Sequence, residues 1–155
     1  MKVTAVIEIP KGDTRRRHLD EAKAGTDNWT LEDFIDLGPI KDRIPVNEGV
    51  MPIHYGFLKN TWNKDERDEI DVLVLSSRTF KPGDEIEIEP TQLIIREDGD
   101  HKVVASDATL VGTLDELPPH EREVVYSYFR YTSPIIEVLG KRETEAYIKQ
   151  NQRGS

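Results

Sequence analysis

Short segments with the composition of β-strands dominate the first two thirds of the chain and constrain its fold more than any other feature. In Glu85-Ile86-Glu87-Ile88-Glu89 apolar and acidic residues alternate strictly, which gives a strand one apolar and one acidic face. The turn residues Lys81-Pro82-Gly83-Asp84 come directly before it. Short strands separated by turn signals favour a small barrel. We expect strands at residues 3–9, 56–58, 70–75, 85–90, 91–96 and 102–105.

The last third of the chain has helical spacing instead. Pro118-Pro119 is placed as a helix start signal, and apolar residues recur at Val124-Val125 and Tyr128-Phe129. Pro134 separates this helix from an apolar stretch at residues 135–139. We therefore expect a mainly β fold with flanking helices, of the α+β class.

The 155 residues are expected to form one domain, residues 1–150, followed by a polar tail at 151–155. The chain has no cysteine, which excludes disulfides, thiolate catalysis and zinc–thiolate sites. Its net charge of -9 argues against sequence-independent nucleic-acid binding. No segment approaches the ~20 apolar residues of a membrane span. We expect a cytoplasmic protein with no nucleic-acid partner and no membrane partner.

A run of acidic residues comes just before the strand expected at residues 70–75. Residues 65–71 contain five carboxylates, and such runs are often only solvated loops. In an extended segment, however, residues two apart face the same side, so Glu66 and Asp68 can point together. A turn at residues 69–70 would bring Asp71 alongside them. Three oxygen donors at one point suit Mg²⁺ or Mn²⁺ rather than zinc.

Several short motifs occur in a fixed order around this acidic run. They are Val6-Ile7-Glu8-Ile9-Pro10-Lys11-Gly12, Asp42-Arg43, Met51-Pro52-Ile53-His54-Tyr55-Gly56-Phe57, Glu66-Arg67-Asp68-Glu69-Ile70-Asp71 and Phe80-Lys81-Pro82-Gly83-Asp84. Together they resemble the soluble family I inorganic pyrophosphatases, with Glu66 in place of the leading Asp of that family's acidic signature. The resemblance covers most of the chain and implies a small closed β-barrel flanked by helices.

The resemblance implies hydrolysis of inorganic pyrophosphate to two phosphates by a metal-activated water. It implies that Asp68 is the carboxylate that acts on this water, and Tyr55 is assigned as a second catalytic residue. Glu66 and Asp71 are the implied ligands of the first metal pair. The implied cofactor is Mg²⁺, with Mn²⁺ as a substitute.

A further metal ligand is implied in the loop at residues 96–102. Asp100 is the best match, because the family places an acid two residues before a substrate lysine, as Asp100 precedes Lys102. Its partner is either Glu97 or Asp98, and we assign Asp98. Without the other motifs this loop would be an ordinary Asp-Gly hairpin turn.

Phosphate binding is implied for Arg43, Lys102, Tyr55 and Tyr131, with Arg17 near the position of an N-terminal substrate lysine. Three of these residues have a simpler alternative role, since Arg43 could form a surface ion pair with Asp42, and both Tyr55 and Tyr131 could be core tyrosines. The four histidines lack metal-ligand spacing and are not expected to bind metal.

Three features differ from the family pattern. Leu19 stands where an acidic metal ligand is expected, and Thr132 stands where a substrate lysine is expected. An insertion spans about residues 26–41, and its segment at 27–37 has the spacing of a short helix that serves either as a lid or as an oligomer contact. The residues that could compensate for a lost cation are Arg15, Arg16, Arg17, Lys23 and Lys141.

Two other functions therefore remain open. One is a divergent relative that hydrolyses another diphosphate or a nucleotide, and the other is a non-catalytic phosphate-binding protein. The family often forms homo-oligomers, and we expect one here. The apolar segment at 135–139 or the pair Trp29 and Phe34 could form the interface, or either could belong to the core.

Overall fold

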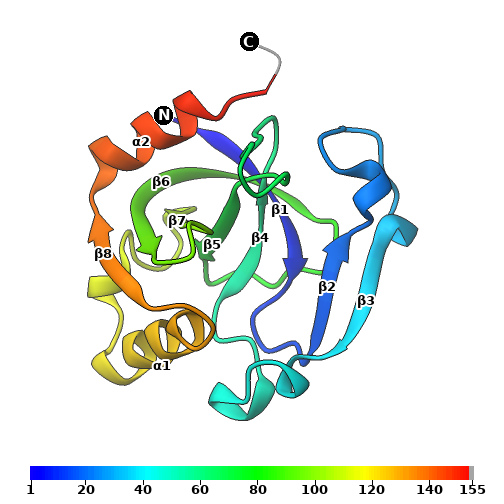
Figure 1. The fold of residues 1–155 in the computed structure, drawn as a ribbon. Coiled ribbons are helices and arrows are strands. Elements are labelled where there is room, and N and C mark those ends of the chain that lie inside the picture. Colours follow the sequence, from blue (N-terminus) through cyan, green and yellow to red (C-terminus); the bar gives the residue numbers. More distant parts are fainter. Residues whose placement is uncertain (154–155) are drawn as a thin grey trace.

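Five strands close into a barrel, as expected from the sequence. The computed structural model describes residues 1–153. Gly154 and Ser155, at the end of the predicted polar tail, lie outside the described residues. Strand β6 pairs with β7 on one edge and with β1 on the other, which closes the ring (Figure 1). The barrel strands in spatial order are β1 (Val3–Ile9), β4 (His54–Leu58), β5 (Asp71–Leu75), β7 (Lys102–Ser106) and β6 (Glu85–Arg96).

The strand pairs in the barrel are antiparallel except for β5 and β7, which run parallel. The parallel register places Asp71 directly opposite Lys102 at the start of both strands. A sixth strand, β8 (Ile135–Leu139), extends the sheet from β6. The apolar stretch after Pro134 is therefore an edge strand, and its Ile136 is exposed.

Residues 85–96 form one long strand rather than the two expected. The ladder with β7 shifts register between Pro90 and Gln92, as at a β-bulge. Proline lacks the N–H that a regular ladder needs, and a bulge is one of the few sheet positions that accept it. The break seen in the sequence at Pro90 is a bulge within β6.

The apolar side chains form two main clusters. One contains residues from all five barrel strands and is joined by Ile148 from helix α2 (Lys141–Gln150). The other lies beneath helix α1 (Pro119–Arg130), whose Val125, Tyr128 and Phe129 are buried as its spacing predicts. Helix α2 was missed because its sequence is mainly polar and only Thr144 and Ile148 are buried.

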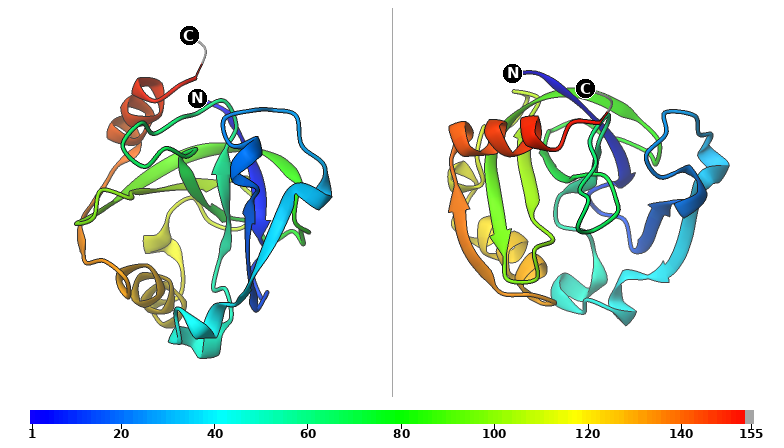
Figure 2. Two further views of the ribbon diagram at one scale, coloured as in Figure 1. Left: turned by 45° about the vertical axis from the view of Figure 1, so that its right-hand side comes forward. Right: turned by 45° about the horizontal axis from the view of Figure 1, so that its top comes forward.

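The insertion contains a hairpin strand rather than the predicted helix. A 3₁₀ turn at Leu31–Asp33 leads into β3 (Phe34–Pro39), which pairs with β2 (Arg15–Leu19) in a separate two-stranded sheet. Phe34 packs with Leu19, Phe57 and the partly buried Trp29. This packing holds the β2–β3 hairpin against the barrel (Figure 2).

No helix within residues 1–153 is long and apolar enough to cross a membrane.

Candidate active site

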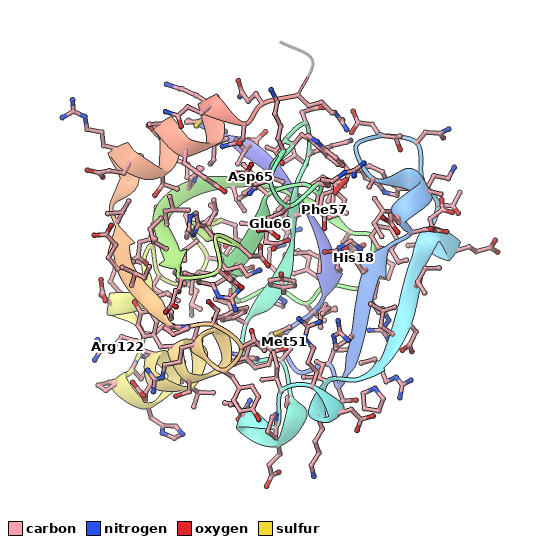
Figure 3. All side chains as sticks on the ribbon, viewed as in Figure 1. His18, Met51, Phe57, Asp65, Glu66 and Arg122 are labelled. Carbon is pink, nitrogen blue, oxygen red and sulfur yellow. The ribbon has the colours of Figure 1, made fainter. Side chains whose placement is uncertain are left out.

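The acidic run lies on a structured loop between β4 and β5. Asn63 organises it, because its side-chain oxygen accepts hydrogen bonds from the backbone N–H groups of Asp65 and Glu66. The backbone of Asn63 pairs with that of Asp68, and Arg67 between them adopts a left-handed conformation with φ of 54°. Figure 3 shows Glu66 on this loop above the barrel and His18 on β2 at its side.

Four of the predicted acids share a small cavity of about 60 Å³ beside this loop: Glu66, Asp68, Asp71 and Asp100. The donors are carboxylate oxygens, which fit a hard divalent cation. Within residues 1–153, however, no three acidic or histidine side chains are already arranged as a metal-binding group. The four carboxylates therefore have the right chemistry for a metal. In this structure three of them are instead paired with the side chains of Lys102 and His18.

Lys102 is the cation that separates two of these acids. Its Nζ lies 2.6 Å from Asp71 Oδ2 and 3.1 Å from Asp100 Oδ2. Burial raises the pKa of Asp71 to about 6, although Lys102 opposes this shift. Burial alone would also raise the pKa of Asp100, but Lys102 and its other partners hold it below its usual range. Lys102 is therefore fixed between two predicted metal ligands.

Tyr55 completes this group. Its hydroxyl accepts a hydrogen bond from Lys102 Nζ at 3.1 Å, and its ring stacks on Phe129 of α1. Burial and the neighbouring Asp71 raise its pKa well above the usual value, so the hydroxyl stays protonated and can donate a hydrogen bond.

Asp68 is paired with a histidine. His18 Nε2 lies 2.9 Å from Asp68 Oδ2, and His18 Nδ1 lies 2.6 Å from the carbonyl oxygen of Leu19. The hydrogen bond to Asp68 is the main reason that the pKa of His18 rises to about 10. His18 Nδ1 also lies 4.0 Å from Glu8, whose buried carboxylate accepts the Leu19 N–H. Leu19 itself is buried in an apolar cluster, and the preceding residue, His18, is the side chain that contacts Asp68.

A larger cavity of about 210 Å³ adjoins these residues and contains Asp68, Asp71 and Asp100 in its wall. The predicted substrate residues Arg17, Arg43, Lys102 and Tyr55 all line it. The structure thus gathers into one cavity acids and cations that are far apart in the sequence.

The loop after β6 distinguishes its two candidate acids. Asp98 lies 3.7 Å from Arg96, and together with burial and Asp100 it raises the pKa of Glu66. The side chain of Glu97 makes no hydrogen bond or ion pair to the described residues. Asp98 is therefore the acid of this pair that lies close enough to influence Glu66, although it does not line the small cavity.

Tyr131 is a predicted substrate residue that the structure places at the surface. It is 53% exposed and is absent from the wall of the larger cavity, whereas Tyr128, one helical turn earlier, is buried there. The alternative prediction that Tyr131 is a core residue is wrong, because its side chain is exposed. Helical spacing predicted that Tyr128 would be buried. The same spacing is expected for a core residue and for a residue in a cavity wall, so it could not identify Tyr128 as a cavity residue.

Arg96 is a cavity residue that the sequence did not reveal. It is 5% exposed, donates to the carbonyl of Phe129, and donates at 2.7 Å to the hydroxyl of Thr132. A guanidinium therefore occupies the space beside the position where the family pattern has a lysine. The only sequence signal was a charged residue at the end of an otherwise apolar strand segment.

Comparison with known proteins agrees with the fold and with the family resemblance seen in the sequence. The inorganic pyrophosphatase family profile matches residues 5–151. An inorganic pyrophosphatase of Nanoarchaeum equitans is 27% identical over 98% of this chain and 96% of its own. One of Thermus thermophilus is 28% identical over 96% of this chain and 85% of its own. These matches do not favour the two alternative functions.

Solved structures support the same fold. The crystal structure of inorganic pyrophosphatase from Ehrlichia chaffeensis superposes with a TM-score of 0.75 at 19% identity, covering 97% of this chain and 92% of that one. The barrel, the order of motifs and the extent of the profile match lead to one conclusion: the chain belongs to the inorganic pyrophosphatase family.

Proposed function

We propose that this chain hydrolyses inorganic pyrophosphate to two phosphates in the larger cavity, with Asp68 as the carboxylate that acts on the water. The observation that carries this proposal is the single cavity in which Asp68, Asp71 and Asp100 face Arg43 and Lys102. Pyrophosphate is a compact polyanion, and its hydrolysis requires cations for its oxygens and a carboxylate beside the water.

The acids would hold divalent metal, for which we propose Mg²⁺ with Mn²⁺ as a substitute. Glu66, Asp71 and Asp100 are the proposed ligands, and Asp98 would complete the set from its position near Glu66. When bound, such a cation lowers the pKa of water and neutralises phosphate oxygens.

The chain's own residues then have separate tasks. Asp68, held by His18, orients the water and takes its proton. Lys102 and Arg43 bind phosphate oxygens, with Arg17 and Tyr131 proposed at the edge of the site. The neutral Tyr55 hydroxyl donates a hydrogen bond to the substrate from its place beside Lys102.

We also propose a cytoplasmic homo-oligomer. The absence of cysteine is compatible with a reducing compartment. Ile136 on the edge strand β8 is 62% exposed, and Leu31 and Leu37 of the insertion are also exposed. Light scattering measures the assembly, and Ile136→Lys is expected to weaken it.

Phosphate release from pyrophosphate with Mg²⁺ or Mn²⁺ tests the activity. Asp68→Asn is expected to reduce kcat by about 100-fold or more, because it removes the carboxylate that accepts the proton. Asp65→Asn is the matched control, since Asp65 lies exposed on the same loop. Equal phosphate release by wild type and Asp68→Asn would contradict the role of Asp68. No release by wild type would contradict the function.

A further inference from the structure

Three consecutive arginines on β2 differ in how their charges are matched. Arg15 Nε lies 3.1 Å from Asp36 Oδ2 on the paired strand β3. Arg17 forms an ion pair with Asp13, at the turn between β1 and β2. Arg16 lines the larger cavity, and its side chain has no hydrogen bond or ion pair to residues 1–153. The charge of Arg16 therefore has no counter-charge among the described residues and lies in the cavity wall.

Arg43 is in the same situation. It follows the 3₁₀ turn Ile40–Asp42 and lines the same cavity, and its guanidinium has no ion pair in the described part of the chain. Its predicted surface pairing with Asp42 does not form. Burial and the nearby Arg43 charge lower the pKa of Arg16. Two neighbouring cations without a counter-charge repel each other unless an anion lies between them.

The other cations of the cavity are already engaged by carboxylates. Lys102 contacts Asp71 and Asp100, and His18 contacts Asp68. Arg96 Nη1 lies 3.7 Å from a carboxylate oxygen of Asp98 and 3.7 Å from one of Asp100. Their charges are matched in the protein itself. The unmatched positive charge lies on the wall formed by Arg16 and Arg43.

A tyrosine hydroxyl accompanies this pair. Tyr128 lines the cavity, and its hydroxyl makes no hydrogen bond to residues 1–153. Burial raises its pKa, while the nearby charges of Arg16 and Arg43 oppose the shift. Two guanidinium groups and a hydroxyl donor are the groups that bind a tetrahedral phosphate well.

We infer that Arg16, Arg43 and the hydroxyl of Tyr128 form a phosphate subsite, in which Arg16 supplies the cation that is absent at Thr132. The role of this subsite in binding one phosphate of pyrophosphate rests on the proposed function. Among the candidate compensating residues, Arg16 is then the main substrate contact. Arg17 is paired with Asp13 and stays at the edge of the site.

Calorimetric titration of the protein with inorganic phosphate, in the presence of EDTA, tests the subsite without any turnover. Arg16→Ala is expected to weaken phosphate binding by about 10- to 100-fold, since a hydrogen bond to a charged group is lost. Arg16→Lys should retain part of the affinity because it keeps the charge but loses the planar fork. Arg142→Ala, an exposed change on α2, is expected to bind phosphate like wild type.

Steady-state kinetics with pyrophosphate and Mg²⁺ provides the second measurement. Arg16→Ala is expected to raise KM by at least about 10-fold, a larger effect than that of Arg17→Ala. If Arg16→Ala matches Arg142→Ala in phosphate affinity while wild type hydrolyses pyrophosphate, the subsite is wrong and the function stands. If phosphate binding depends on Arg16 but wild type releases no phosphate, the function is wrong and the subsite stands.

Discussion

His18 and Asp68 lie 50 residues apart in the sequence, yet their side chains meet with Nε2 and Oδ2 2.9 Å apart. The other ring nitrogen of His18 faces the carbonyl oxygen of Leu19, which can only accept a hydrogen bond. Both nitrogens therefore act as donors, and His18 is an imidazolium ion. This fixed positive charge lies beside the carboxylate proposed to act on the water.

Replacing His18 is expected to shift the pH dependence of activity. Burial alone would raise the pKa of Asp68, and His18 is the main group that lowers it. In His18→Ala the pKa of Asp68 should rise, so the acidic limb of the kcat/KM profile should move up by about one pH unit. His120→Ala, an exposed change on α1, is the control. An acidic limb that stays in place in His18→Ala would show that His18 does not hold Asp68 ionised.

Lys102→Met is expected to destabilise the metal-free protein by about 3 to 5 kcal/mol, because it leaves Asp71 and Asp100 without their buried cation. Mg²⁺ should recover part of this loss by neutralising the same acids. Urea unfolding in EDTA and then in Mg²⁺ measures both effects. Lys59→Met breaks the more exposed pair with Glu85 and should cost at most about 1 kcal/mol. The prediction fails if Mg²⁺ stabilises Lys102→Met no more than wild type.

Glu8 should make stability fall as pH rises. Burial raises its pKa from 4.5 to about 8, so between these values the folded state keeps a proton that the unfolded state has lost. The folded state then loses up to about 1.4 kcal/mol of stability per pH unit in this window. Glu8→Gln should flatten this slope while still accepting the Leu19 N–H. Urea unfolding from pH 5 to 8 is the measurement, and equal slopes in both proteins would refute the assignment.

Gly56→Ala should prevent strands β1 and β4 from pairing as they do. A Cβ at Gly56 would lie 1.9 Å from the carbonyl oxygen of Val6, which is backbone and cannot move aside. We expect a loss of at least about 3 kcal/mol of stability, measured by urea unfolding. Gly140→Ala is the control, because its Cβ would lie 3.5 Å from the flexible side chain of Glu143. A fully stable Gly56→Ala would contradict the close approach of these strands.

Local patterns predicted much of the fold. The strict alternation at residues 85–89 identified a barrel strand, and the spacing of Val125, Tyr128 and Phe129 identified helix α1. The hairpin partner β2 and helix α2 were missed. Three arginines in a row carry no strand signal, and their conformation depends on pairing with β3. Segments that are stabilised mainly by tertiary contacts have weak patterns of their own.

The sequence by itself determined the barrel, the family and the types of residue at the site, because side-chain periodicity and the order of motifs are local properties. Only the tertiary structure decided which charges are matched. It bound Arg17 to Asp13 and Lys102 to Asp71, and it left Arg16 open to the cavity. Electrostatic pairing depends on distances of a few ångströms between residues far apart in the chain, and folding sets those distances.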